Sequence, residues 1–463
     1  MKRSMSRVAI VSLAMSLGAA GCGNFLTGDS VINDPNHPSN ATLQQSFLAV
    51  QAGLFGMQES TLPLTVCMWM QQCTGIGGRF VDQYGKYTVT DASWSADFTA
   101  IYSGGGLVDI RRVEDGARAA NDRKWLGIAQ VYEAFLIGTA ADLWGDIPYR
   151  EAVNVAISTP ALDPQMQVYA DVQAMLDSAL VNLASGMGTG PLAADLVYGG
   201  DAAQWTEAAN TLKARFYMHT AEVNGAPDYA AAITAATAGI SSPANDFRAY
   251  HGSGTGEGNI WVQFAATTFG QDVVAGKRLV DIMVARSDPR LAQYFDTNST
   301  GGYGGQDINT PVNNSLVSKL GGTRHNALFR QPLVTYGENE LILAEAYNRG
   351  TPANDALALT HLNNERATVP LPNVVAVAGA ALLDSIMTEK YVALFQNIET
   401  YNDYRRTCLP ALQPFPSTEF SNKVPGRLFY GLAEENANPN IPPPSTQLAT
   451  NGFRNPNDPV ACP

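Results

Sequence analysis

The stretch WLGIAQVYEAFLIGTAADLWGDIPYREA, residues 125–152, decides the fold that the sequence predicts. Its large apolar residues recur at helical spacing with small residues between them, so the pattern predicts a buried, closely packed helix over 125–143. Gly127 and Gly138 inside this helix should each cost about 1 kcal/mol relative to Ala, so we attribute them to the close approach of a second helix. The helix ends where the proline-containing turn 145–148 begins.

The start of the same helix also follows the register of a tetratricopeptide helix, because the order Trp125, Ile128, Ala129, Tyr132 matches the pattern W-x2-L-G-x2-Y. Other segments show helical periodicity, namely 42–56, 107–120, 166–184, 201–224, 277–285, 338–349, 353–366 and 382–396. Only a Gly- and Pro-containing turn separates 338–349 from 353–366, so these two segments predict a helical hairpin of tetratricopeptide size. We therefore expect a mainly α-helical protein.

Three regions lack this regularity. Residues 61–106 mix aromatic and polar side chains with glycines, residues 241–326 are dominated by Gly, Asn, Ser and Thr, and the chain from 410 onward is rich in loops and proline. Loops this long in a compact chain are usually functional or disordered. We see no linker between the helical and irregular regions, so we expect residues 41–463 to form a single domain.

The N-terminus resembles an export signal. Basic residues precede the apolar run 8–17, and small residues lead directly to Cys22. This arrangement predicts a bacterial lipoprotein signal peptide over 1–21, lipidation of Cys22 and a flexible tether over 22–40. The alternative is a plain secretory signal with an incidental cysteine. The apolar run is shorter than the ~20 residues that a membrane span needs, and no later stretch is long and apolar enough.

The composition narrows the possible partners. The chain has 29 basic and 42 acidic residues, a net charge of −13, so nucleic-acid phosphates would repel it. Hydrophobic residues make up 45% of the chain, which is ample for a large core. We expect a globular protein that does not bind nucleic acid.

Five cysteines are present, and lipidation of Cys22 would leave four. Local pairing predicts one bridge between Cys67 and Cys73 and another between Cys408 and Cys462, which an oxidising compartment would permit. Three connectivities are possible for four cysteines. Metal binding is the minor alternative, since no histidine neighbours either pair.

Catalytic motifs are missing from the sequence. It contains neither H-E-x-x-H nor G-x-S-x-G, and a P-loop-like segment at 270–277 has the wrong glycine spacing, with Arg278 in place of Ser or Thr. The loop DTNSTGGYGGQD places Asp296, Asn298 and Asp307 at positions 1, 3 and 12 of an EF-hand-like calcium loop. An ordinary Asn- and Gly-rich surface loop is the alternative. A calcium ion at this loop is the one cofactor that the sequence suggests.

Several blocks together resemble one family, the SusD/RagB family of starch-utilisation-like outer-membrane lipoproteins. They follow one another in the right order through nearly the whole mature chain. The blocks are the lipidation motif at Cys22, LWGDIPYREA (143–152), AANTLKARFYMH (208–219), DPRLAQYF (288–295), ELILAEAYNRG (340–350), LNNERA (362–367), EKYVALFQNIETYNDYRR (389–406) and PGRLFY (425–430).

The resemblance implies a mostly helical fold in which four tetratricopeptide-like helix pairs back a loop-rich face that captures glycans. It also implies a binding protein, not an enzyme, that caps a SusC-like TonB-dependent transporter and passes nutrient to it. The expected location is the bacterial outer membrane, with a lipid anchor and the body facing the cell exterior. Two features depart from the family: no acidic run follows Cys22, and the paired cysteines are not a general family trait.

Sugars present apolar C–H faces to aromatic rings and hydroxyls to polar side chains, so a binding site should combine both. We select Trp69, Arg79, Tyr84 and Tyr303 as candidate ligand-binding residues because they fall in loops outside the helical periodicity. Each of them alone could instead be structural. Two other functions stay open at this point: an exported glycan-degrading enzyme, and a structural adaptor that binds only a protein partner.

Overall fold

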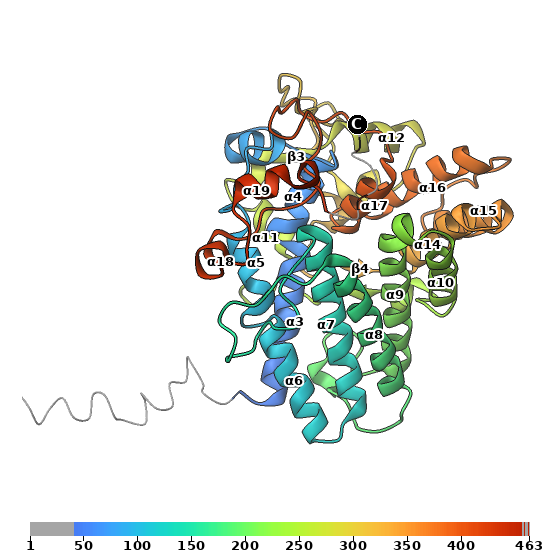
Figure 1. Ribbon diagram of the computed structural model, residues 1–463. Helices are drawn as coiled ribbons and strands as arrows, with labels where there is room; N and C mark the ends of the chain where they lie inside the picture. The colour runs from blue at the N-terminus through green and yellow to red at the C-terminus, as the bar shows by residue number, and fades with distance from the viewer. Residues whose placement is uncertain (1–40, 456–457, 459–461, 463) are drawn as a thin grey trace, which may run out of the picture.

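Figure 1 shows the computed structural model of the chain, which describes residues 41–455, 458 and 462. The predicted signal peptide (1–21), the lipidation site Cys22 and the tether (22–40) lie outside the described residues. Across the part of the chain that the structure describes, no helix combines the length and the apolar character needed to cross a membrane.

Long helices stand side by side and form what we call the helical array (Figure 1). Its members are α3 (Leu43–Glu59), α6 (Leu107–Ala119), α7 (Arg123–Trp144), α8 (Gln165–Leu183), α9 (Ala202–Asn224), α10 (Ala226–Thr237), α14 (Tyr336–Arg349), α15 (Asp355–Thr368) and α16 (Gly379–Ala393). From α6 to α10 each helix packs on the next one along the chain, and α14 then continues the array from α10 to α15 and α16. This succession of packed helix pairs confirms the predicted helical scaffold.

Shorter elements form a loop-rich lobe at one end of the array (Figure 1). They are α4 (Thr61–Trp69), β1 (Cys73–Gly75), the π-helix η1 (Phe80–Gly85), α5 (Ser95–Tyr102), α11 (Ile260–Ala265), β3 (Val273–Ala275), α12 (Lys277–Ala285), α13 (Leu291–Tyr294), α17 (Glu399–Thr407), α18 (Leu432–Ala437) and α19 (Pro444–Ala449). β1 pairs antiparallel with β3, with Cys73 opposite Ala275. A second antiparallel pair joins β2 (Phe247–Arg248) to β4 (Pro332–Val334).

The two glycines of α7 lie where neighbouring helices approach it most closely. A Cβ atom on Gly138 would lie 2.1 Å from Cζ of Phe216 on α9, and one on Gly127 would lie 2.9 Å from the carbonyl oxygen of Ala179 on α8. Real Cβ atoms essentially never come within 3.0 Å of another heavy atom. The predicted close approach is therefore confirmed: α8 and α9 pack closely against α7 at its two glycines.

A buried ion network ties α7, α9, α14 and α17 together. His219 lies between two carboxylates, with Nδ1 2.7 Å from Oδ1 of Asp142 and Nε2 2.6 Å from Oε1 of Glu399. Arg215, one helical turn before His219, donates two hydrogen bonds to Glu338, from Nε at 2.5 Å and from Nη2 at 2.6 Å. Buried charges persist only when they are paired in this way, so the network fixes how the four helices meet.

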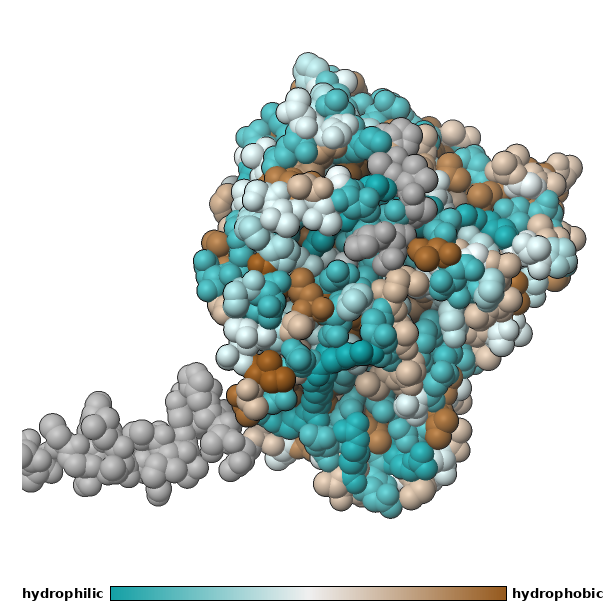
Figure 2. All heavy atoms as spheres, in the orientation of Figure 1, coloured by the Kyte–Doolittle hydropathy of each residue, from teal (hydrophilic) through white to brown (hydrophobic). Residues whose placement is uncertain are grey.

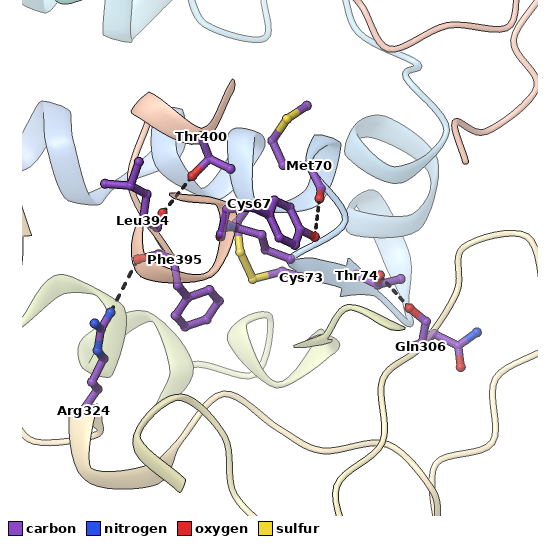
Figure 3. Close-up of a disulfide and its surroundings, with 11 residues drawn as sticks. Cys67, Met70, Cys73, Thr74, Gln306, Arg324, Leu394, Phe395 and Thr400 are labelled. Atoms are coloured by element: carbon purple, nitrogen blue, oxygen red, sulfur yellow. Dashed lines mark hydrogen bonds between the residues drawn. A yellow bond between two sulfur atoms is a disulfide. The ribbon is translucent and has the colours of Figure 1, made fainter. Parts of the chain in front are cut away.

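Both predicted disulfide bridges are present. Cys67 at the end of α4 is bonded to Cys73 at the start of β1, as Figure 3 shows, and Cys408 is bonded to Cys462 with a Cα–Cα distance of 5.2 Å. The first bridge fastens α4 to the β1–β3 pair, and the second fastens Cys462, near the C-terminus, to the end of α17.

The irregular regions contain more regular structure than the sequence indicated. Residues 61–106 include α4, η1 and α5, so the prediction that Trp69 and Tyr84 lie in loops was wrong. α4 has buried residues on all sides, and a helix of that kind shows no polar face to reveal it. The alanine-rich helix α10 was also missed, because its small residues give a weak periodic signal.

The surface over the helical array is mainly polar. On the face shown in Figure 2, hydrophilic residues predominate and hydrophobic residues form only small, scattered patches. Apolar patches of limited size are normal on soluble proteins, so this face offers no broad hydrophobic docking area.

Candidate functional site

A pocket of about 480 Å³ opens where the lobe meets the end of α3. We call it the Arg79 pocket. It is larger than the pocket of about 290 Å³ beside Tyr404 and Cys462, and it lies in the size range of ligand sites. Its walls come from α3, α4, η1, α5 and α11. The lining residues are Glu59, Ser60, Thr61, Leu64, Arg79, Gln83, Tyr84, Thr90, Ala92, Ser93, Ala96, Asp97, Ile260, Trp261 and Phe264.

One side of the Arg79 pocket is aromatic and includes Tyr84, Trp261 and Phe264. Phe80 supports this side from η1: its ring stacks on Tyr84 with centroids 6.1 Å apart and meets Phe264 edge-on at 5.7 Å. Contacts of this kind fix ring orientations because each aromatic pair prefers a stacked or edge-to-face geometry. The pocket therefore presents a rigid aromatic surface.

The same pocket is also lined by two carboxylates, Glu59 and Asp97, and by the amide of Gln83. Glu59 is buried at the C-terminal end of α3 and accepts hydrogen bonds from Nε2 of His251 at 3.0 and 3.1 Å. Burial raises the pKa of Glu59, whereas the hydrogen bond and the charge of His251 lower it. Burial also raises the pKa of Asp97 to about 6. Gln83 is held by a 3.2 Å hydrogen bond to Oγ of Ser93. These groups can accept from and donate to ligand hydroxyls.

Arg79 supplies the positive charge of the pocket. Its guanidinium carbon lies 5.1 Å from the ring centre of Phe80 and 5.7 Å from that of Phe269, which are cation–π distances. Arg79 is exposed, and within the described residues no carboxylate pairs with it, so its five N–H donors are open to solvent and to a ligand. An arginine held by ring faces keeps its donors free for a ligand.

The structure separates the four candidate residues chosen from the sequence. Arg79 and Tyr84 line the same pocket. Trp69 is 0% exposed and packs edge-on against Tyr87, Trp94 and Tyr401 in the core. Tyr303 is half-buried in the loop before Gln306 and packs on the edge of the core, away from the Arg79 pocket. The structure therefore brings together two of the four.

Sequence reasoning missed Glu59, Asp97, Trp261 and Phe264. A signal was present for one of them, since Trp261 is an aromatic residue in a region dominated by small polar residues, which is the criterion that selected Tyr303. Glu59 and Asp97 carried no such signal, because single acidic residues at helix ends are common and only the fold places them in one pocket with aromatic residues.

Three side chains of the proposed calcium loop already accept backbone hydrogen bonds, from this loop or from segments that follow it. Oδ1 of Asp296 accepts from the backbone of Gly322, Oδ1 of Asn298 accepts from Thr300, and Oδ1 of Asp307 accepts from Asn309. Calcium at this loop stays a prediction.

One group of histidine and carboxylate atoms lies close enough to hold a metal ion in the part of the chain that the structure describes, namely Asp142, His219 and Glu399. Both ring nitrogens of His219 already face a carboxylate, on opposite sides of the ring. Burial would lower the pKa of His219, but the two carboxylates raise it to about 9. The three side chains thus form an ion network, with His219 between two carboxylates.

Stacked helices that support a lobe with an aromatic, partly charged pocket make up a helical ligand-binding protein. The family model described as "starch-binding associating with outer membrane" matches residues 35–431, and the chain belongs to this SusD-like family. No protein with a curated description matches the chain. Members of the family are binding proteins, so the alternative of a glycan-degrading enzyme is set aside and the chain is not an enzyme.

Solved structures share the fold. A chitin-binding protein superposes with a TM-score of 0.73 at 20% identity, covering 89% of this chain and 97% of its own. A SusD/RagB family protein from Bacteroides thetaiotaomicron gives a TM-score of 0.68 at 21% identity, covering 89% and 97%. A chitin-binding SusD homolog from Flavobacterium johnsoniae gives 0.71 at 19%, covering 90% and 98%. At these identities the likeness establishes the mainly helical SusD-like fold.

Proposed function

We propose that the Arg79 pocket binds an oligosaccharide released from a polymer. The observation that carries the proposal is the pairing of a rigid aromatic side, from Tyr84, Trp261 and Phe264, with the unpaired guanidinium of Arg79 in one pocket of about 480 Å³. Sugar rings stack their C–H faces on aromatic rings, and their hydroxyls form hydrogen bonds with polar groups of the same pocket. The chitin-binding proteins that share the fold support a glycan as the ligand class.

Calorimetry tests this site. The chain with Cys22→Ser, which prevents lipidation, is titrated with soluble oligosaccharides of chitin, starch and other polymers. We expect Arg79→Met and Tyr84→Ala each to weaken binding about tenfold, because each removes contacts of the order of 1–2 kcal/mol. Arg112→Met on the exposed face of α6 is the matched control and should leave the affinity unchanged.

Tyr303→Ala distinguishes this site from the other position that the sequence favoured. If the Arg79 and Tyr84 variants bind with normal affinity and Tyr303→Ala binds weakly, the oligosaccharide site is instead assigned to the 296–307 loop. Unchanged affinity in all three variants would refute both assignments.

We further propose that the protein is anchored in the outer membrane through lipid at Cys22, faces the cell exterior and delivers its ligand to a SusC-like TonB-dependent transporter. The family description, which places its members with the outer membrane, supports the location. Detergent extraction and pull-down from cells grown on the inducing polymer should recover a barrel partner in equal amount. A Cys22→Ala chain that stays membrane-bound would contradict the anchor.

A structural adaptor is the remaining alternative. It predicts that the chain copurifies with a transporter but binds no glycan in calorimetry. Protection of a bound oligosaccharide from added glycosidase only when both chains are present would support delivery and exclude the adaptor.

A further inference from the structure

Trp261 lines a second, smaller cavity of about 20 Å³, which we call the Arg324 cavity. Arg324, His325 and Gln331 bound it from one segment, and Tyr294 closes it from α13. A volume of this size holds one or two groups as large as a water molecule and is too small for a sugar ring.

Arg324 brings an uncompensated positive charge to this cavity. Its guanidinium carbon lies 4.3 Å from the ring centre of Tyr294, and its one hydrogen bond in the described structure runs from Nη1 to the carbonyl oxygen of Phe395 at 3.4 Å (Figure 3). No carboxylate pairs with it within the described residues. Burial lowers the pKa of Arg324, and the positive charges of Arg290 and Arg248 lower it further.

Two more groups on the cavity wall are donors without acceptors. Nε1 of Trp261 is buried and unpaired, and so is Nε2 of Gln331, whose side chain is 1% exposed. Asn259 uses both of its polar atoms elsewhere, donating from Nδ2 to the carbonyl oxygen of Phe329 at 3.1 Å and accepting at Oδ1 from Val262 at 3.1 Å. No Asp or Glu lines the cavity in the part of the chain that is described. Two buried donors without partners thus belong to residues that line the cavity.

We propose that the Arg324 cavity binds a chloride-sized anion, held by the guanidinium of Arg324, Nε1 of Trp261 and Nε2 of Gln331. A buried donor without an acceptor costs about 1–3 kcal/mol, and Arg324, which is partly buried, has no counter-charge within the described residues. A water molecule would accept from two of these donors but would leave the charge of Arg324 uncompensated. A monatomic anion accepts from all three and neutralises the guanidinium, whereas a carboxylate attached to a sugar would not fit in about 20 Å³.

The anion would also position a wall of the Arg79 pocket. Trp261 lines both that pocket and the Arg324 cavity, and its Nε1 has no other partner, so an anion at Nε1 would fix the orientation of the indole ring. Chloride should therefore increase the affinity of the Arg79 pocket for its oligosaccharide about threefold. This last consequence rests on the proposed function, whereas anion binding itself does not.

Thermal unfolding of the Cys22→Ser chain tests the anion site. The melting temperature is measured in sodium chloride and in sodium gluconate at equal ionic strength, and chloride should raise it in a saturable manner. Arg324→Met should abolish the difference between the salts. Arg330→Met is the matched control, because Arg330 also stacks on an aromatic ring, at 5.1 Å from Tyr250, and also donates to a backbone carbonyl, that of Leu196.

Trp261→Phe provides a second variant that keeps the ring and removes only the N–H donor. It should weaken the apparent affinity for chloride at least threefold while the protein stays folded. The proposal would be overturned if the Cys22→Ser chain had the same melting temperature in the two salts. A chloride effect that survives in Arg324→Met would also overturn it.

Bromide diffraction locates the ion. Crystals grown in sodium bromide should show an anomalous peak between the guanidinium of Arg324 and Nε1 of Trp261, and a featureless map at that point, with water alone in the cavity, would refute the assignment. A bromide peak in a protein that binds no oligosaccharide would uphold the anion site and remove only the proposed glycan function.

Discussion

Replacing His219 with Gln should change how the stability of the protein depends on pH. In the native protein the imidazole lies 2.7 Å from Asp142 and 2.6 Å from Glu399. Burial opposes its charge, but the two carboxylates raise its pKa from 6.5 to about 9, so His219 is an imidazolium at neutral pH. Gln is similar in size and can still donate one hydrogen bond, but it carries no charge.

The expected magnitude follows from the two pKa values. A folded-state pKa of about 9 against 6.5 means that the folded protein holds this proton more tightly than the unfolded chain does. The difference corresponds to roughly 3 kcal/mol of stability, which is fully present below pH 6.5 and is lost as the pH rises through about 9. On the acid side the pKa of Glu399 falls from 4.5 to about 2, because His219 and Arg215 overcome the effect of burial. The contribution of Glu399 is present above pH 4.5 and is lost as the pH falls through about 2.

Denaturant unfolding at pH 6, 7.5 and 9.5 measures the effect. Between pH 6 and pH 9.5 the free energy of unfolding of the native protein should fall by roughly 3 kcal/mol more than that of the His219→Gln variant. His361→Gln is the control, because His361 is partly exposed and contacts a single carboxylate, Glu340. If His219→Gln loses stability as steeply as the native protein over this interval, the imidazolium does not hold the network and the reasoning fails.

Three further predictions concern packing, cross-links and the pocket. Gly138→Ala should destabilise the protein by roughly 1–3 kcal/mol, because the new methyl group clashes with Phe216. Gly56→Ala should stabilise α3 by about 1 kcal/mol, because nothing lies within 4 Å of its new methyl group. Thermal melting of the two variants compares these effects. Removing the Cys408–Cys462 bridge, which spans 54 residues, should lower the free energy of unfolding by on the order of 4 kcal/mol, because a bridge that closes a longer loop restricts the unfolded chain more. Removing the Cys67–Cys73 bridge, which spans 6 residues, should cost about half as much. Denaturant midpoints measure both losses, and equal losses would contradict this dependence on loop length. Affinity for a neutral oligosaccharide should rise as Asp97 ionises near pH 6, and a calorimetric pH series on Asp97→Asn should lack that step.

The helical scaffold could be predicted from the sequence because its determinants are local. Apolar spacing located α7, and the small residues within it correctly indicated a second helix in contact, since only glycine fits where Phe216 approaches Gly138. α4 was missed for the opposite reason. It is buried on all sides, so no polar face distinguished it from an irregular apolar stretch.

The site was predictable only in part, because pockets form from residues distant in sequence. Arg79 and Tyr84 stood out as a charged and an aromatic residue in an irregular region, and they line one pocket. Trp69 met the same criterion but lies in the core, because a tryptophan in an unpatterned stretch fills a buried space as readily as it faces a ligand. Glu59 and His251 are 192 residues apart, and their contact depends on the whole fold.

The position of Trp261 also gives this protein a natural optical probe. The chain contains six tryptophans, and all six are buried. Trp261 alone among the six borders both the Arg79 pocket and the Arg324 cavity. Any change in intrinsic fluorescence on adding a sugar or a halide should therefore arise from one fluorophore, and the spectrum of Trp261→Phe supplies the baseline to subtract. Unlabelled protein would suffice to titrate both ligands in a cuvette.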